Sequence, residues 1–362
     1  MRRILYVEDA PSVGGSAVCL LELVSRLDPS AYRPFVLFRY DLPFRAEFDR
    51  AGVPNATWAS LRGAREEALP ADLQPGPVSP VRRTAPYRLL RSVRTYARDD
   101  RPAVPWLARW IRSESFSLVH ANNAVAANLA AIAAASRAPT PVVSHQRGYF
   151  RHTVFQRRLS RAVARFVCVS RSIAEDFARQ GFPGDRIAVV HDGIDVESIR
   201  PRARNAGAPV LVGWFGRLVA WKGAETLVEA ARLVLEKRPD VRFVIAGDGP
   251  ELSRLRESVA RAPETAAAVD LAGFRNDAKD MIAGCDIFVN TSIEPEPLGH
   301  SALEAAAFGI PLVTSNCGGL TEIVVNGDNG FLFEPGNPAA LAARLLCLVE
   351  DPALRRRFGV AA

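Results

Sequence analysis

Short apolar runs alternate with helix-like patterns along the whole chain. This alternation is typical of parallel sheets with helices on both faces, and it predicts an α/β fold built from doubly wound sheets. In the first half of the chain we expect strands at residues 4–7, 35–38, 118–121, 142–145, 166–169 and 187–190. In the second half we expect strands at residues 210–214, 243–246, 287–290 and 312–314, each followed by a loop rich in Gly, Asp, Ser or Pro.

The chain length favours two domains. Its 362 residues exceed the roughly 250 to 300 at which a single hydrophobic core stops growing. We expect a boundary after Asp195 and a hinge near residues 195–208, because residues 200–209 have linker composition without apolar periodicity. We therefore predict Rossmann-like domains at 1–195 and 196–345 and a C-terminal helix at 346–362. Ligands bind outside the carboxyl ends of parallel strands, so the two sheets are expected to face each other across a cleft.

Composition and cysteine content exclude several classes of protein. The chain is 48% hydrophobic and 23% charged, which is ordinary for a globular protein and unlike a disordered or fibrous one. Glu8 and Asp9 end the first apolar run too early for a signal peptide, and no apolar stretch is long enough to predict a membrane span. The five cysteines stand singly, without metal-ligand spacing, which favours reduced thiols and a cytoplasmic location.

Glycine-rich loops follow two of the predicted strands. Gly14 and Gly15 lie between the first strand and a helix that is expected to begin near Ala17, so their backbone amides could approach an anion. A plain turn is the alternative. Gly318 and Gly319 form a similar pair after the strand at 312–314. The run Gly247-Asp-Gly-Pro lacks the third glycine of a dinucleotide fingerprint, and we interpret it as structural.

Two cations follow the strand at 210–214. Arg217 offers a bidentate fork and Lys222 a point charge, a suitable pair for two adjacent phosphates. Glycines flank both residues, and their place at a strand end favours binding over the alternative of a solvated surface pair.

Two carboxylates follow the strand at 287–290. Glu296 is expected in a loop and Glu304 about one turn into a helix, on a face shared with small and apolar residues. A carboxylate on such a face needs a partner, and ribose hydroxyls would supply one. The alternative, a helix-capping or surface carboxylate, suits Glu294 better than Glu304.

In this order the motifs resemble the family 4 retaining glycosyltransferases of GT-B fold, the glycosyl transferases group 1. The likeness runs from about Ile4 to Leu345. Beside the residues above it includes His120-Ala-Asn122, Ser170-Arg-Ser172, the segment from His191 to Asp195, and Gly273-Phe-Arg275.

The resemblance implies transfer of a sugar from a UDP- or GDP-sugar, with retention of the anomeric configuration, to a lipid-linked, polysaccharide or small-molecule acceptor held by the N-terminal domain. Arg217 and Lys222 would bind the diphosphate, Glu304 the ribose and Glu296 the donor sugar, and these cations, with Glu296 and His120, are the candidate catalytic residues. The remaining donor contacts implied are Gly14, Gly15, Phe274, Arg275, Leu298, Gly299, Gly319 and Leu320. The chain has no Asp-x-Asp pair, so neither a metal nor another cofactor is expected.

The chain departs from this family at three places. Many relatives carry a second histidine where this chain has Asn122, which we place on the acceptor side together with His145 and Arg147. His145 and Arg147 are expected to compensate near the acceptor or the donor sugar, and a structural role in the cleft wall is the alternative for each. Asp192 replaces a usual asparagine in the hinge. The sequence also stops at Ala362, where relatives commonly have a further helix that crosses back to the first domain.

Most of the net charge of +7 comes from arginine, and nine arginines lie between Arg82 and Arg112. Arg88, Arg91, Arg94 and Arg98 have helical spacing beside apolar residues, which predicts a basic amphipathic helix. Such a helix suits peripheral contact with an anionic membrane, a lipid-phosphate acceptor or an acidic polysaccharide, and a solvated helix is the alternative. No nucleic-acid-binding motif accompanies the charge, so no nucleic acid partner is expected.

Two other functions share the predicted architecture. A nucleotide-sugar 2-epimerase would release a modified sugar without an acceptor, whereas the cation pair with two glutamates favours transfer. A non-catalytic glycan-binding relative is the other alternative, and the retained cations and glutamates argue against it.

Overall fold

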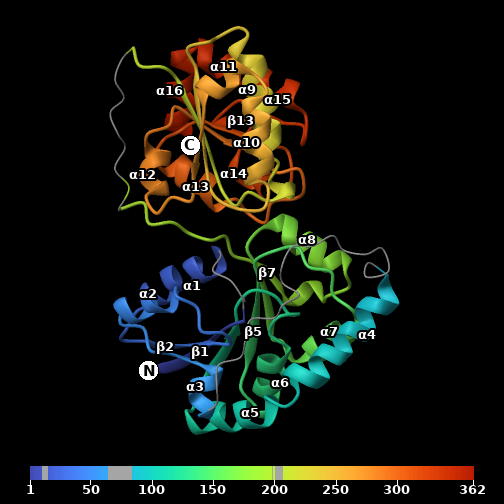
Figure 1. The fold of residues 1–362 in the computed structure, drawn as a ribbon. Helices are drawn as coiled ribbons and strands as arrows, with labels where there is room; N and C mark the ends of the chain where they lie inside the picture. Colours follow the sequence, from blue (N-terminus) through green and yellow to red (C-terminus); the bar gives the residue numbers. More distant parts are fainter. Residues whose placement is uncertain (10–14, 64–83, 198, 200–206) are drawn as a thin grey trace. The chain divides into compact units, whose positions relative to one another are not determined.

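The computed structural model describes residues 1–9, 15–63, 84–197, 199 and 207–362. The chain divides into two compact units, Met1–His191 and Asp192–Ala362 (Figure 1). Both are layered structures in which helices cover the two faces of a parallel sheet.

Among the described residues, the N-terminal unit forms a seven-stranded parallel sheet of order β3-β2-β1-β4-β5-β6-β7. Its strands are β1 (Arg2–Glu8), β2 (Tyr32–Phe38), β3 (Asn55–Thr57), β4 (Leu118–Ala121), β5 (Val142–Gln146), β6 (Arg165–Cys168) and β7 (Ile187–Val189). The α-helices are α1 (Gly15–Ser25), α2 (Arg45–Arg50), α3 (Trp58–Arg62), α4 (Ala85–Thr95), α5 (Val104–Ser113), α6 (Leu129–Arg137), α7 (Val154–Leu159) and α8 (Arg171–Arg179).

Residues 207–362, described without a gap, form a six-stranded parallel sheet of order β10-β9-β8-β11-β12-β13. Its strands are β8 (Leu211–Phe215), β9 (Arg242–Ala246), β10 (Val269–Gly273), β11 (Ile287–Asn290), β12 (Leu312–Ser315) and β13 (Gly330–Phe333). The α-helices are α9 (Ala224–Leu235), α10 (Leu252–Ala260), α11 (Pro263–Ala268), α12 (Ala278–Ala283), α13 (His300–Ala307), α14 (Leu320–Ile323), α15 (Pro338–Glu350) and α16 (Pro352–Ala361).

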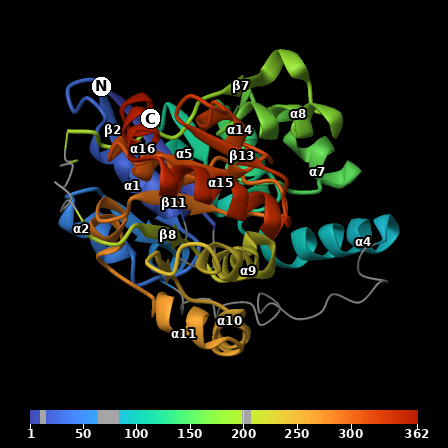
Figure 2. The same cartoon turned by 90° about the horizontal axis from the view of Figure 1, so that it is seen from above.

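The core of the C-terminal unit explains why its central strands are continuous apolar runs. Alternate residues of a strand point to opposite faces, so a strand buried on both faces is apolar throughout. Val212 and Trp214 of β8 pack with α9 and α15, which lie side by side (Figure 2). Phe215 packs on the other face with α12, α13 and α14.

The predicted fold class is confirmed, and each of the ten predicted strands is present with small shifts at its ends. The prediction missed β3, β10 and β13, which all lie at sheet edges. In β3 and β10 polar residues interrupt the apolar run on which the prediction rested. The run at Phe331–Phe333 of β13 is only three residues long, and the prediction overlooked it.

The prediction of a single helix over residues 346–362 is wrong. Helix α15 ends at Glu350 and α16 begins at Pro352. The Asp351 side chain accepts a hydrogen bond from the Leu354 amide at 2.9 Å, which caps the new helix. Proline is favoured at the first position of a helix and cannot continue the preceding one, so the break follows from Asp351-Pro352.

Each sheet has one position at which the strand order reverses. The chain adds β2 and β3 on one side of β1 and then returns to add β4 on the other side. It adds β9 and β10 on one side of β8 and then returns to add β11. Loops after the two strands beside the reversal diverge, so a ligand can bind between them.

Gly247 shows why the run after β9 is rich in glycine. A Cβ at this position would lie 1.8 Å from the backbone oxygen of Gly216, in the loop that carries Arg217. The run is therefore structural, because a side chain here would push the loop after β8 away from its neighbour.

We expect Gly247→Ala to lower the free energy of unfolding by about 2 kcal/mol, because inserted atoms displace packed backbone. Urea unfolding followed by tryptophan fluorescence would measure the change. Gly184→Ala is the matched control, since its added methyl would meet no atom within 4 Å. Equal stability of the two variants would contradict the packing argument.

Candidate active site

The loops after β8 and β11 meet at the reversal of strand order in the C-terminal unit. The loop after β8 holds a 3-10 turn, Ala220–Lys222, and the left-handed Gly223. Backbone and side-chain hydrogen bonds join the two loops, from the Ile293 amide to the Trp221 oxygen at 2.8 Å and from Thr291 Oγ1 to the Lys222 oxygen at 3.0 Å. The positions of Lys222 and Glu296 are therefore fixed by both loops.

Lys222 and Glu296 form a buried ion pair. The Lys222 Nζ atom lies 2.7 Å from Glu296 Oε1 and 2.6 Å from Oε2, and their side chains are 15% and 7% exposed. Ser292 Oγ also donates to Glu296 Oε2, at 2.7 Å. Because the two charges balance each other, neither stands alone in the interior.

Arg217 differs from Lys222 in being exposed. Its loop is held by hydrogen bonds from the Gly216 amide to the Ala246 oxygen at 3.1 Å and from the Leu218 amide to the Asp248 oxygen at 2.8 Å. Within the described part of the chain its guanidinium makes no salt bridge. Arg217 therefore adds an uncompensated positive charge beside the neutral Lys222–Glu296 pair.

Glu304 lies near the middle of α13, with a side chain that is 15% exposed. Its Oε1 atom is 3.6 Å from Lys279 Nζ and 3.7 Å from His300 Nδ1. These separations are longer than hydrogen bonds, so the carboxylate is attracted to the Lys279 ammonium and can still accept hydrogen bonds from another donor.

The glycine pair after β12 holds the backbone of Glu296 in place. Gly318 has φ +59°, and a Cβ there would lie 2.3 Å from the backbone carbonyl oxygen of Glu296. The Gly319 amide donates to that same oxygen at 2.7 Å. Leu298 and Leu320 are buried, and Gly299, with φ +101°, precedes α13. These residues support the position of Glu296.

Phe274 and Arg275 lie apart from the reversal, because they follow β10 at the sheet edge. The Phe274 side chain is 71% exposed. Arg275 Nε and Nη2 donate to the two carboxylate oxygens of Asp277 at 2.8 and 2.7 Å. The structure does not bring these two residues into contact with the ion pair.

A second polar cluster lies at the reversal of strand order in the N-terminal unit. Asn122, fully buried after β4, donates from Nδ2 to Glu8 at the end of β1 and accepts at Oδ1 from Arg147 Nε at 2.9 Å. It also donates to the Ser16 oxygen at 3.3 Å. Asn122 therefore links the carboxylate of Glu8, the guanidinium of Arg147 and the start of α1. Gly15 begins that helix, whereas Gly14 lies outside the described residues.

His120 and His145 lie beside this cluster as neutral side chains, with their rings tilted by 40° and their centroids 5.3 Å apart. His120 Nε2 and His145 Nδ1 are 3.2 Å apart, and the His120 ring lies on Tyr6 with centroids 4.9 Å apart. Burial, with a smaller contribution from Arg147, lowers the pKa of His120 to about 3. Burial and the charge of Arg147 also lower the pKa of His145 well below its usual value. Near neutral pH neither ring is a cation.

The sequence analysis missed Glu8 and Ser292. Glu8 was considered only as the end of an apolar run. It is 1% exposed, and its carboxylate accepts hydrogen bonds from the side chains of Asn122 and Asn123. Its place at the carboxyl end of the first strand is the signal that could have identified it. Ser292 orients Glu296, and its position just after β11 carries the same signal.

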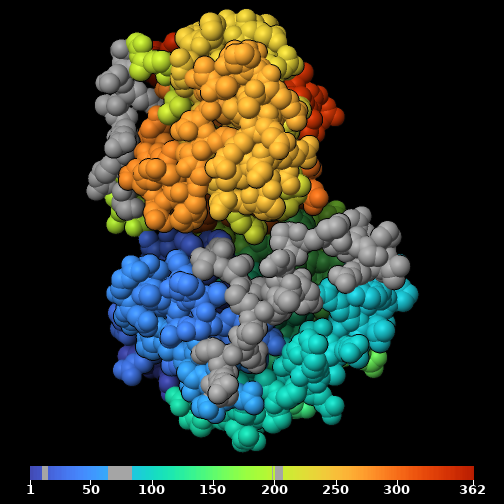
Figure 3. All heavy atoms as spheres, viewed as in Figure 1, coloured from blue at the N-terminus to red at the C-terminus, as the bar shows by residue number. Residues whose placement is uncertain are grey.

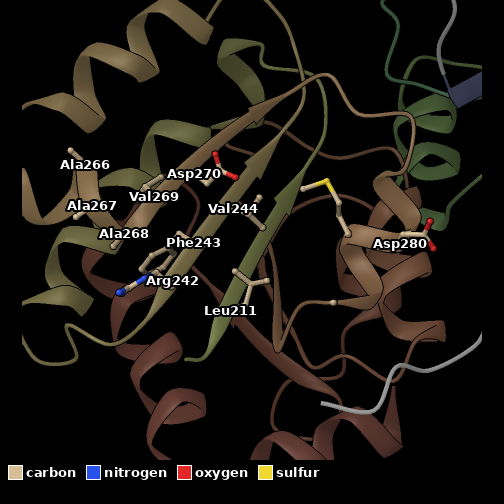
Figure 4. A pocket seen from close by; sticks show the side chains of 12 residues that line it. Leu211, Arg242, Phe243, Val244, Ala266, Ala267, Ala268, Val269, Asp270 and Asp280 are labelled. Carbon is tan, nitrogen blue, oxygen red and sulfur yellow. The ribbon is translucent and has the colours of Figure 1, made fainter. Parts of the chain in front are cut away.

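A pocket of about 550 Å³ lies at the other end of the C-terminal sheet (Figure 4). Its lining includes Leu211, Arg242 and Val269, the first residues of β8, β9 and β10. It is therefore separate from the residues after the strand ends. Among the described residues no group of three or more His, Cys, Asp or Glu side chains is arranged to hold a metal, and no helix is both long and apolar enough to cross a membrane.

Two curated proteins similar to this chain match 60% and 72% of it. A curated D-inositol 3-phosphate glycosyltransferase of Streptomyces avermitilis is 28% identical over 72% of this chain and 58% of its own length. A GDP-mannose-dependent alpha-(1-6)-phosphatidylinositol dimannoside mannosyltransferase of Mycobacterium tuberculosis is 29% identical over 60% of this chain and 61% of its own. The chain thus spans about three fifths of the length of these relatives.

The fold is similar to that of solved GT-B structures. One is the crystal structure of the Anabaena protein HepE in complex with UDP and glucose. The match covers 100% of this chain and 93% of the HepE chain, with a TM-score of 0.76 and 21% sequence identity. Two family profiles divide the sequence between them. Glycosyltransferase Family 4 matches residues 13–198, half of the chain, and Glycosyl transferases group 1 matches residues 195–362. The chain therefore belongs to the Family 4 glycosyltransferases.

Proposed function

We propose that this protein is a retaining glycosyltransferase that uses a nucleotide-diphosphate sugar and needs no metal ion. The observation that carries the proposal is the grouping of Arg217, Lys222 and Glu296 at the strand reversal of a Family 4 chain. Loops at such a reversal are where α/β sheets bind nucleotides.

In this proposal the diphosphate binds to Arg217 and Lys222. The exposed Arg217 guanidinium offers a bidentate fork for one phosphate. Lys222 has three N–H donors, and its two contacts with Glu296 leave a third for the other phosphate. Glu304 accepts hydrogen bonds from the ribose, and Glu296 holds a hydroxyl of the donor sugar.

The proposed chemistry exchanges one bond at the anomeric carbon. The bond to the diphosphate oxygen breaks, and a bond to the acceptor hydroxyl oxygen forms on the same face. The acceptor proton passes to the leaving phosphate. Arg217 and Lys222 stabilise the charge that develops on the diphosphate, which is the role of preorganised cations in electrostatic catalysis.

The N-terminal unit is our proposed acceptor unit. Its strand reversal presents Arg147, oriented by Asn122, beside the neutral His120 and His145. His120 keeps its proposed place as a hydrogen-bonding group near the reacting sugar. Because burial lowers its pKa to about 3, it acts there as a neutral imidazole and not as an acid.

The names of two relatives support the proposed UDP- or GDP-sugar donor. HepE is described in complex with UDP and glucose, and the mycobacterial relative is named as GDP-mannose-dependent. The proposed acceptor is a carbohydrate or a lipid-linked sugar, in line with the mycobacterial relative's name. We propose a cytoplasmic location, since all five cysteines, each a described residue, are free thiols.

A thermal-shift panel of nucleotide diphosphates and nucleotide sugars tests the proposal. A ligand that binds only the folded state raises its stability by mass action. A selective shift with one UDP- or GDP-sugar would identify the donor, and release of the free nucleotide only when an acceptor is added would show transfer. Well-folded protein that shifts with none of these ligands would overturn the proposal in favour of a non-catalytic glycan-binding protein.

We expect Glu304→Ala to weaken donor binding roughly ten- to a hundredfold, because a hydrogen-bonded charged group contributes in this range. Calorimetric titration with the donor nucleotide would measure the loss. Glu294→Ala is the matched control, since Glu294 is exposed in the same segment. If Glu294→Ala were the more damaging change, the assignment of the glutamate pair would be wrong.

We expect Arg217→Ala to lower kcat roughly a hundredfold with a smaller change in KM, because the charge it stabilises is largest in the transition state. Steady-state kinetics of nucleotide release would measure both constants. Arg254→Ala, which removes a guanidinium that is 66% exposed on α10, should leave them unchanged. A rise in KM alone would show that Arg217 only binds the ground state.

A further inference from the structure

Helix α4 exposes an apolar ridge, which we define as Leu89, Leu90 and Val93. These side chains are 40%, 69% and 39% exposed. None of the eleven residues of α4, all of them described, is buried. The spacing places the three residues on neighbouring positions of the helix surface, so they form one continuous apolar strip that faces water.

Arginines flank this ridge. Residues 85–98 contain Arg88, Arg91, Arg94 and Arg98 and no acidic residue. Arg98 is paired with Asp99 at 2.6 Å, and Arg88 is half-buried. Arg91 and Arg94 are exposed and lie one turn apart beside Leu90. The outer side of α4 is thus both apolar and positively charged.

The packed side of α4 adjoins the ridge. Ser92 Oγ lies 3.0 Å from Thr153 Oγ1, and the Tyr96 ring packs edge-on against Phe155 of α7 with centroids 5.4 Å apart. These contacts anchor the helix at the surface of its unit, where Figure 3 shows it in cyan. Ser92 and Tyr96 lie three and seven residues beyond Leu89, so the ridge borders the packed side, and Leu90, 69% exposed, is its residue farthest from that side.

The neighbouring helix α7 borders a second positively charged surface. A pocket of about 610 Å³ is lined by Arg157, Arg158, Arg161 and Arg186, with Asp185 as its one carboxylate. Arg157 and Arg186 already donate to backbone oxygens, and all four retain their charge. Val154, 62% exposed, lies in the same lining. The surface next to α4 thus also suits an anionic partner.

We propose that α4 is a docking helix for an anionic lipid bilayer. The apolar ridge would enter the boundary between headgroups and acyl chains, while Arg91 and Arg94 bind lipid phosphates and the arginines beside α7 add attraction. A helix with an apolar strip and a basic flank binds in this interfacial position. A soluble polyanion would satisfy the arginines but would leave the ridge in water, so the ridge favours a lipid surface.

Vesicle co-sedimentation of the full chain tests this proposal. We expect binding to vesicles of phosphatidylcholine mixed with phosphatidylglycerol, weak binding to phosphatidylcholine alone, and release as NaCl is raised, because salt screens surface charge. The assay needs no nucleotide sugar, so its outcome does not depend on the proposed glycosyl transfer. Folded protein that fails to bind the anionic vesicles would overturn the proposal.

Two variants separate the ridge from the charge. Leu90→Gln should lower the vesicle partition coefficient roughly tenfold through lost apolar burial, and the double change Arg91→Gln with Arg94→Gln should lower it roughly thirtyfold. Val325→Gln and Arg254→Gln, at sites 61% and 66% exposed in the C-terminal unit, are matched controls. Circular dichroism would verify that each variant is folded. Vesicle binding that the arginine changes abolish but Leu90→Gln leaves intact would show attraction by surface charge alone, and would overturn the insertion of the ridge that distinguishes a lipid surface from a soluble polyanion.

Discussion

The reversal of strand order beside β8 is the constraint on which the candidate active site depends. Parallel strands present their carboxyl ends at one edge of a sheet, and the loops after β8 and β11 leave that edge in opposite directions. Lys222 comes from the first loop and Glu296 from the second, so their ion pair exists only because the chain returns to add β11 next to β8. Gly223 lets the loop after β8 approach the backbone of Thr291, and Gly318 lets the loop after β12 approach the backbone of Glu296.

The buried ion pair also determines how charge is distributed at the site. Removing one partner of such a pair leaves the other uncompensated in a poorly solvated place. Lys222 and Glu296 balance each other, with Ser292 as an additional donor to the carboxylate. In the proposed site the net attraction for a diphosphate would therefore come from the exposed Arg217, and Lys222 would still have one N–H donor to offer.

The same principle operates in the N-terminal unit with a different residue set. Glu8 is the last residue of β1 and Asn122 comes directly after β4, and these are the two strands beside that reversal. An amide can donate and accept at once, so Asn122 joins the carboxylate of Glu8 to the guanidinium of Arg147. The two neutral histidines lie against this network without adding charge.

The sequence by itself determined the fold class, the central strands and the loops in which the site residues lie, because apolar periodicity and glycine placement are local properties. It did not reveal the edge strands β3, β10 and β13, which lack full burial. The partners of the charged groups were also hidden. Lys222 and Glu296 are 74 residues apart, and Glu8 and Asn122 are 114 apart. Tertiary structure decided these pairs, because strand order, and not spacing along the chain, sets which loops meet.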